Sequence, residues 1–165
     1  PELPVRVATD LEAVARSADV ISCATAAKEP VILGAWVRPG THTDFIGNHE
    51  RKNRETDTDL VVKSRVYVDS RANTMNEAGE ILLPIEEGRI TEGHVIGELA
   101  DLCSGRVGGR RTAGEITLLE AERDELKAPD IVKRIWKREI AEVSKYIENA
   151  QANGWVPKGK YKYEL

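Results

Sequence analysis

Runs of apolar residues separated by polar linkers divide the first seventy positions of the chain into short structural elements. Three of these runs are uncharged or rich in β-branched residues, and they predict core strands over Val20–Ala24, Thr41–Ile46 and Arg65–Asp69. Val5–Ala8 is a shorter strand-like run. Because helical or turn segments separate these runs, the pattern favours parallel strands joined by right-handed crossovers.

Apolar positions at helical spacing lie before and between the strands. Residues 11–18 have this spacing, and Thr9 or Asp10 can cap the helix that they predict. Leu60–Lys63 predicts a short helix or turn. The indicated fold class is therefore α/β, with a mainly parallel, doubly wound sheet and flanking helices.

The pattern is weaker after the third strand. Asn73–Glu80 predicts a helix that ends at Gly79, and Ile81–Ile85 is an apolar run that Pro84 excludes from the centre of a sheet. His94–Cys103 has the spacing of an amphipathic helix. Gly105–Gly109 follows that helix and predicts a plain loop.

The composition changes near residue 120. Residues 1–120 carry 14 basic and 20 acidic side chains, a net charge of −6, whereas residues 121–165 carry 10 and 8, a net charge of +2. The second segment predicts an appended amphipathic helix that ends near Gly154, with an apolar stripe at helical spacing. The stripe consists of Trp136, Ile140, Val143, Ile147 and Ala150. We therefore expect a domain over 1–120 and a C-terminal helix and tail over 121–165.

The composition argues against several classes of protein, among them nucleic-acid-binding and membrane proteins. The 165 residues have a net charge of −4 and a pI near 5.5, which argues against a partner that is a nucleic acid or an anionic membrane. No apolar run is long enough to span a membrane, and no signal peptide opens the chain. Cys23 and Cys103 are far apart in sequence, which argues against a disulfide framework or a zinc site. These features predict a cytoplasmic protein without a bound metal.

Candidate chemistry is sparse. The chain contains neither GxGxxG nor a Walker-type phosphate loop. His49 lies in the loop after a predicted strand, at the sheet edge where α/β proteins bind ligands, so it is a candidate acid or base. Thr25 also ends a strand, and its hydroxyl can contact a cofactor or cap the next turn. We interpret His42 and His94 as structural, and the charged run Glu50–Glu55 as a solvated face.

Several segments, taken in order, resemble the ornithine cyclodeaminase/mu-crystallin family over about residues 5–119. Each segment is weakly specific by itself, but the ordered set is more specific. The segments are Ala18–Thr25, Pro30–His42, Ile46–His49, Arg54–Asp57, Val66–Arg71, Glu77–Glu80, Gly97–Leu99 and Gly114–Leu118.

The resemblance implies the second part of a Rossmann-like domain that binds NAD or NADP. Family activities include ornithine cyclodeamination, amino-acid dehydrogenation and imine reduction, and some members are small-molecule binding proteins. By resemblance, Thr25 and Ala26 would contact the cofactor, as would Gly47 and His49 near its nicotinamide end. His49 stands where cyclodeaminases carry a catalytic aspartate, which weakens the case for ornithine cyclodeamination. The residue that selects NAD or NADP follows a strand that this sequence lacks.

Other family parts are also missing from the sequence, namely the substrate-binding and dimerisation region and the phosphate-binding glycine loop. Two functions therefore remain open. The chain is either part of an NAD(P)-dependent amino-acid or imino-acid oxidoreductase or cyclodeaminase, inactive alone, or a truncated, fused or engineered fragment that only self-associates. Its expected partners are further copies of itself or the missing family half, and a small amino acid as ligand.

Overall fold

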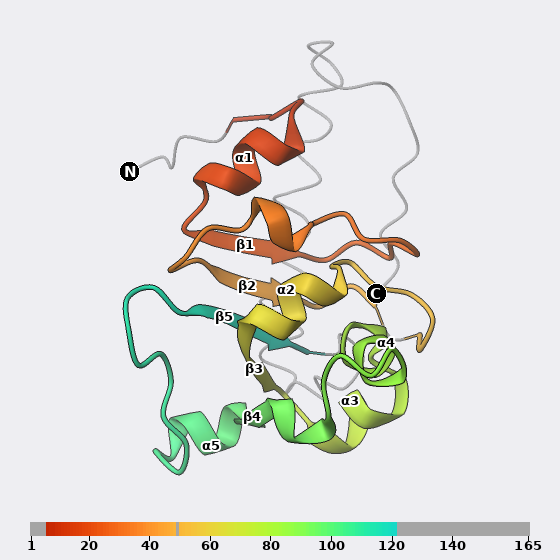
Figure 1. The fold of residues 1–165 in the computed structure, drawn as a ribbon, viewed down its shortest axis with the longest axis vertical. Helices are drawn as coiled ribbons and strands as arrows, with labels where there is room; N and C mark the ends of the chain where they lie inside the picture. Colours follow the sequence, from red (N-terminus) through yellow and green to blue (C-terminus); the bar gives the residue numbers. More distant parts are fainter. Residues whose placement is uncertain (1–5, 49, 122–165) are drawn as a thin grey trace, which may run out of the picture. The chain divides into compact units, whose positions relative to one another are not determined.

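A parallel sheet forms the centre of the computed structural model, which describes residues 6–48 and 50–121 (Figure 1). The sheet has five strands in the order β1-β2-β5-β3-β4. In chain order the strands are β1 (Val20–Cys23), β2 (His42–Phe45), β3 (Ser64–Val68), β4 (Val95–Glu98) and β5 (Ile116–Glu120). Every neighbouring pair runs parallel, so the predicted α/β class is confirmed.

Short helices connect these strands, and polar side chains cap several of them. Asp10, not Thr9, caps the first helix, because its Oδ1 accepts the Ala13 N–H at 3.0 Å. Asp57 caps the second in the same way. The helices are α1 (Leu11–Ser17), α2 (Thr58–Lys63), α3 (Arg71–Glu77), α4 (Gly79–Glu86) and α5 (Leu99–Cys103), with the 3-10 turns η1 (Gly34–Trp36) and η2 (Glu92–His94).

The three predicted core strands are all present, within a residue or two of their expected ends. The strand-like interpretation of Val5–Ala8 is wrong where it can be tested, since residues 6–8 form no strand. Residues 122–165 lie outside the described residues, and so does the predicted C-terminal helix with its apolar stripe. None of the described helices has the length and apolar composition needed to cross a membrane.

The prediction of one helix over His94–Cys103 is wrong. His94 ends η2, Val95–Glu98 forms the strand β4 beside β3, and only Leu99–Cys103 is helical. Burial alternates along β4 because its side chains point to opposite faces in turn. The central strand β5 had no counterpart in the sequence prediction, yet it pairs with both β2 and β3.

Two helices replace the single helix predicted over Asn73–Glu80. α3 ends at Glu77, and α4 starts at Gly79 and continues through Pro84, so the apolar run 81–85 is helical. Pro84 is absent from the sheet, as expected, and the described structure places it in the second turn of an eight-residue helix. Ile81 of α4 packs into the hydrophobic core together with residues of the sheet and of α2.

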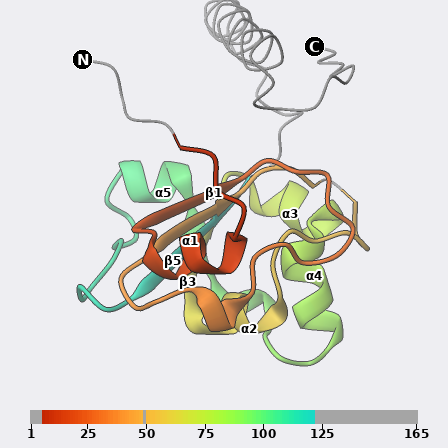
Figure 2. The ribbon, with the colours of Figure 1, turned by 90° about the horizontal axis from the view of Figure 1, so that it is seen from above.

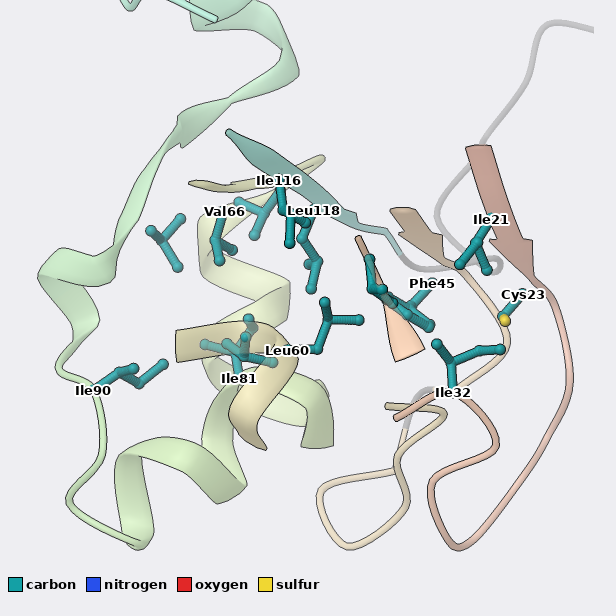
Figure 3. Close-up of a cluster of buried hydrophobic side chains, with 14 of the residues drawn as sticks. Ile21, Cys23, Ile32, Phe45, Leu60, Val66, Ile81, Ile90, Ile116 and Leu118 are labelled. Carbon is teal, nitrogen blue, oxygen red and sulfur yellow. The ribbon is translucent and has the colours of Figure 1, made fainter. Parts of the chain in front are cut away.

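The hydrophobic core lies between one face of the sheet and the helices α2 and α4 (Figure 3). Phe45 and Leu118 from the sheet are fully buried, as are Leu60 from α2 and Ile81 from α4. Figure 2 shows α2 on one side of the sheet and α5 on the other. The carboxyl ends of the parallel strands share one edge of this layered unit, which is where the candidate site lies.

Candidate functional site

The carboxyl ends of β1 and β2 are neighbours because these strands pair in parallel, with Cys23 opposite Phe45. Thr25 and Gly47 each lie two residues beyond their strand, and there the two backbones nearly touch. A β-carbon on Gly47 would collide with the Thr25 nitrogen and lie 2.8 Å from the Ala24 carbonyl carbon, so only glycine permits this approach. The structure thus brings Thr25 and Gly47 together at one edge, as the sequence predicted.

The Glu55 carboxylate joins these two ends. Its Oε1 accepts the Thr25 backbone N–H and the Thr25 hydroxyl, the latter at 2.6 Å. Its Oε2 accepts the Gly47 N–H at 2.9 Å. Glu55 is 0% exposed, so a single buried carboxylate connects the carboxyl ends of two strands. The Thr25 hydroxyl therefore bonds to Glu55, and among the described residues it caps no turn.

Backbone pairing with a distant segment holds Glu55 in place. Its carbonyl oxygen accepts the N–H groups of Val31 and Ile32 at 2.8 and 3.0 Å. The next residue, Thr56, pairs with Ile32 in a short parallel bridge and donates its hydroxyl to the Ile32 carbonyl at 2.9 Å. Residues 55–56 are therefore fixed between the sheet and the 31–34 segment.

The interpretation of Glu50–Glu55 as a solvated face is wrong at its end. The run begins exposed at Glu50, Arg51 and Lys52, but it ends at the fully buried Glu55. Long-range pairing buries this last residue, and a window of alternating charges carries no signal of such pairing. Sequence reasoning therefore missed Glu55.

Asn48 adds a second connection across the same edge, and sequence reasoning missed it as well. It is buried, and its Nδ2 donates to the Ala27 carbonyl at 2.8 Å. Ala26, between the two bonded residues Thr25 and Ala27, is exposed. His49 lies outside the described residues, so its predicted role as a catalytic residue stays a prediction.

Acidic residues at the ends of β4 and β5 bond to α3, the helix that follows β3. Glu98, at the end of β4, accepts the Arg71 N–H at 2.8 Å. Glu120, at the end of β5, accepts the Thr74 hydroxyl at 3.0 Å. Among the described residues, no group of three or more His, Cys, Asp or Glu side chains is arranged to hold a metal ion.

The two histidines that the structure describes belong to the framework, as interpreted from the sequence. His42 Nδ1 lies 2.8 Å from the Thr117 hydroxyl, and burial lowers the pKa of its imidazole, with Asp44 opposing and Arg110 reinforcing that shift. His94 Nε2 lies 2.9 Å from the Val61 carbonyl oxygen.

One part of this edge is closed by internal hydrogen bonds, and the part beside it is exposed. Because Glu55 accepts three hydrogen bonds, its carboxylate is occupied as a structural acceptor. Beside it Thr25 and Ala26 are exposed, whereas Thr25 and Glu55 fill the space that a side chain on Gly47 would occupy. Ligands of open α/β sheets bind in the crevice outside the carboxyl ends of the strands.

Known proteins of similar sequence and structure include several reductases. The chain is 42% identical over 121 residues to a delta(1)-pyrroline-2-carboxylate reductase of Colwellia psychrerythraea, covering 73% of this chain and 38% of that protein. The Thermococcus litoralis delta(1)-pyrroline-2-carboxylate reductase, solved with NADH and L-proline, matches with a TM-score of 0.66 and 40% identity over 67% of this chain and 34% of that one. The iminosuccinate reductase of Paracoccus denitrificans, solved with NAD+, matches with a TM-score of 0.63 and 29% identity over 68% and 34%.

This chain therefore spans little more than a third of the length of these relatives. Residues 1–122 match the ornithine cyclodeaminase/mu-crystallin family, in agreement with the resemblance seen in the sequence segments. The match includes the whole described sheet and the edge formed by Thr25, Gly47 and Glu55. The chain belongs to the ornithine cyclodeaminase/mu-crystallin family.

Proposed function

We propose that this chain supplies the nicotinamide-side part of an NAD(P)-binding domain in an enzyme that reduces the C=N bond of an imino acid. The observation that carries the proposal is the joined edge of β1 and β2, where Glu55 holds Thr25 against Gly47. This edge is the place where open α/β sheets bind ligands. The names of the relatives, which are reductases of cyclic or linear imines, support the substrate class.

Four residues would hold the cofactor in this proposal. Thr25, Ala26 and Gly47 would line the nicotinamide end, since Thr25 and Ala26 are exposed and Gly47 lies against Thr25 at the same edge. His49, two residues after Gly47, would donate or accept the proton that accompanies reduction, because imidazole titrates near neutral pH. The bound cofactor would supply the hydride.

The pyrophosphate of the cofactor would need residues that these 165 do not provide. The sequence has no glycine-rich phosphate loop, whose backbone N–H groups and helix dipole hold pyrophosphate in related folds. We therefore expect the chain alone to bind NADH weakly and to show no turnover of an imino acid. Catalysis requires both reactants to be held in a reacting geometry.

An NMR titration of the full chain with NADH tests the proposal. Millimolar NADH should shift the amide signals of residues 24–27 and Gly47, and leave the loop 105–109 unchanged. Ala26→Trp should abolish these shifts by filling the edge. Ala113→Trp, at an exposed position before β5, should leave them intact. Shifts located elsewhere, or equal behaviour of the two variants, would contradict the proposal.

A second candidate function is self-association, and one observation favours it. β1 pairs only with β2 among the described residues, and Val20 on this edge strand is 61% exposed. An exposed strand edge is a template for pairing with another chain. Light scattering at tens of micromolar tests this candidate, and a monomer of 18.3 kDa would exclude it.

A further inference from the structure

A second buried carboxyl group lies directly behind Glu55. Glu80, in the first turn of α4, is 1% exposed, and its Oε1 accepts the backbone N–H of Glu55 at 2.8 Å. Its Oε2 is buried without a hydrogen-bond partner among the described residues. Two acidic side chains are thus buried side by side behind the candidate site.

The loop that carries Glu55 is pressed against the start of α4. A β-carbon on Gly79 would collide with the Asn53 carbonyl oxygen and lie 3.1 Å from that of Arg51, so glycine is required at this approach. The bond from Glu55 N–H to Glu80 follows directly after this contact. The backbone of the loop is therefore held from α4, while its Glu55 side chain reaches to β1 and β2.

We propose that Glu80 is a positioning residue which, through the Glu55 backbone and as a neutral carboxylic acid, fixes the carboxylate that joins Thr25 to Gly47. In this arrangement α4 controls the spacing of two strand ends with which it makes no direct hydrogen bond. The part that concerns the cofactor rests on the proposed function, whereas the part that concerns the geometry does not.

The charges around the pair favour a neutral Glu80. Glu55 accepts three hydrogen bonds on its carboxylate, whereas Glu80 has one unpartnered oxygen. No lysine or arginine among the described residues forms an ion pair with either acid. Two adjacent buried carboxyl groups without a counter-charge do not both ionise readily.

The local pKa shifts agree with this assignment. Burial raises the pKa of the Glu80 carboxyl, and the Glu55 carboxyl raises it further, whereas the backbone N–H groups of Glu55 and Glu80 and the nearby Asn48 side chain lower it. The thiol of Cys23, on β1, also faces this cluster. Burial, with Glu55, Asp44 and Glu80, raises its pKa to about 12, so it stays neutral and adds no further negative charge. Ionisation of Glu80 would thus place an uncompensated second charge beside Glu55.

The test follows protonation and geometry in the same sample by NMR of the full chain. In the wild type, the ¹³C carboxyl signal of Glu80 should titrate above the range of an ordinary glutamate, and the Thr25 and Gly47 amides should shift with the same midpoint. Glu80→Gln keeps the acceptor oxygen and cannot ionise, so these amide shifts should become independent of pH. Glu86→Gln, at an exposed position on the same helix, should behave as the wild type.

Loss of the acceptor should loosen the edge without unfolding the chain. Glu80→Ala should speed hydrogen exchange of the Gly47 amide roughly tenfold, with a smaller effect on amides of β4. Glu80→Gln should restore slow exchange. Wild-type amides that do not titrate, or a Glu80 carboxyl that titrates as an ordinary glutamate, would overturn the proposal. The carboxyl measurement needs only the wild type, so it decides even if a variant fails to fold.

A cofactor titration separates this proposal from the proposed function. NADH should perturb the Thr25–Gly47 edge more weakly as pH rises through the Glu80 titration, and the Glu80→Gln variant should lose this dependence. If NADH leaves the edge of the wild type unperturbed at every pH, the proposed function fails, whereas the amide titration still tests Glu80. If NADH binds the edge with the same affinity before and after Glu80 ionises, the positioning role in cofactor binding is wrong.

Discussion

The two faces of the sheet are built from different kinds of side chain. The register decides which residues share a face, since paired residues of parallel strands point the same way. The face toward α2 and α4 carries Ile21, Cys23, Phe45, Val66, Val68, Ile116 and Leu118, together with the buried polar residues Thr43, Ser64 and Glu120. The opposite face carries Val20, Ser22, His42, Asp44, Arg65, Tyr67, Thr117 and Leu119, of which most are polar.

The opposite face is held by individual hydrogen bonds. Ser22 donates its hydroxyl to Asp44 Oδ1 at 2.6 Å, and Tyr67 donates its hydroxyl to the Gly108 carbonyl at 2.7 Å. One such bond contributes about 1 kcal/mol, whereas a buried aliphatic side chain contributes about 1.5–3 kcal/mol through exclusion from water. We therefore expect the face toward α2 and α4 to contribute most of the stability, and the other face to tolerate substitutions better.

Adjacent leucines on β5 give the largest expected effect. Leu118 is 0% exposed and points to the face toward α2 and α4, which we call the packed face. Leu119 is half-buried and points to the opposite, hydrogen-bonded face. Leu118→Ala should lower the free energy of unfolding by about 2–5 kcal/mol. Leu119→Ala should lower it by less than half as much. Urea denaturation of both variants measures this, and equal losses would contradict the difference between the faces.

Substitution of Glu55 tests how much a buried polar group at the carboxyl edge of the sheet contributes to stability. Glu55→Ala leaves the Thr25 and Gly47 N–H groups without their acceptor, so we expect a loss of about 2–3 kcal/mol in the free energy of unfolding. Glu50→Ala changes an exposed glutamate in the same loop and should cost less than about 0.5 kcal/mol. Thermal and urea unfolding of the pair provide the measurement. Similar losses of stability in the two variants would support the interpretation of Glu55 as a solvated residue.

The packed face also explains which strands the sequence could predict. Val20–Ala24 and Arg65–Asp69 were recognisable because uncharged or β-branched runs suit a buried parallel strand. Val95–Glu98 was mistaken for helix because Val95, Ile96, Leu99 and Leu102 also fit helical spacing. Neither local spacing nor composition records that β3 lies beside this segment, and that pairing decides its structure.

The candidate site was predictable only in part, for the same reason. Thr25 and Gly47 follow recognisable strands, so parallel pairing was enough to bring them together. Glu55 and Glu80 were hidden, because their burial depends on contacts between residues that are 24 to 30 positions apart. Neither a glutamate in a polar loop nor one at the start of a helix gives a local sign of such contacts.

Tyr67 sharpens the comparison on the hydrogen-bonded face. Tyr67→Phe removes the bond to Gly108 and the contact with Arg65 Nη2 at 3.2 Å, while keeping the ring. We expect a loss of about 1 kcal/mol, as is typical for one buried hydroxyl. Hydrogen exchange in the 105–109 loop should increase, and an unchanged free energy of unfolding would show that water replaces both partners.

The two cysteines compare buried and exposed positions without any mutation. Cys23 is buried on the packed face and its pKa is raised to about 12, chiefly by burial, whereas Cys103 is exposed. Because the thiolate is the reactive form, a thiol reagent at pH 8 should modify one cysteine per folded chain and two in denaturant. Peptide mass mapping identifies the modified residue, and rapid labelling of Cys23 in the folded chain would contradict the packing of this face.

The raised pKa of Cys23 also predicts how the stability of the chain changes with pH. The unfolded thiol ionises near 9.0 and the folded one near 12, so stability should fall as pH rises between these values. Cys23→Ser should remove that slope at some cost in stability, and Cys103→Ser should leave both unchanged.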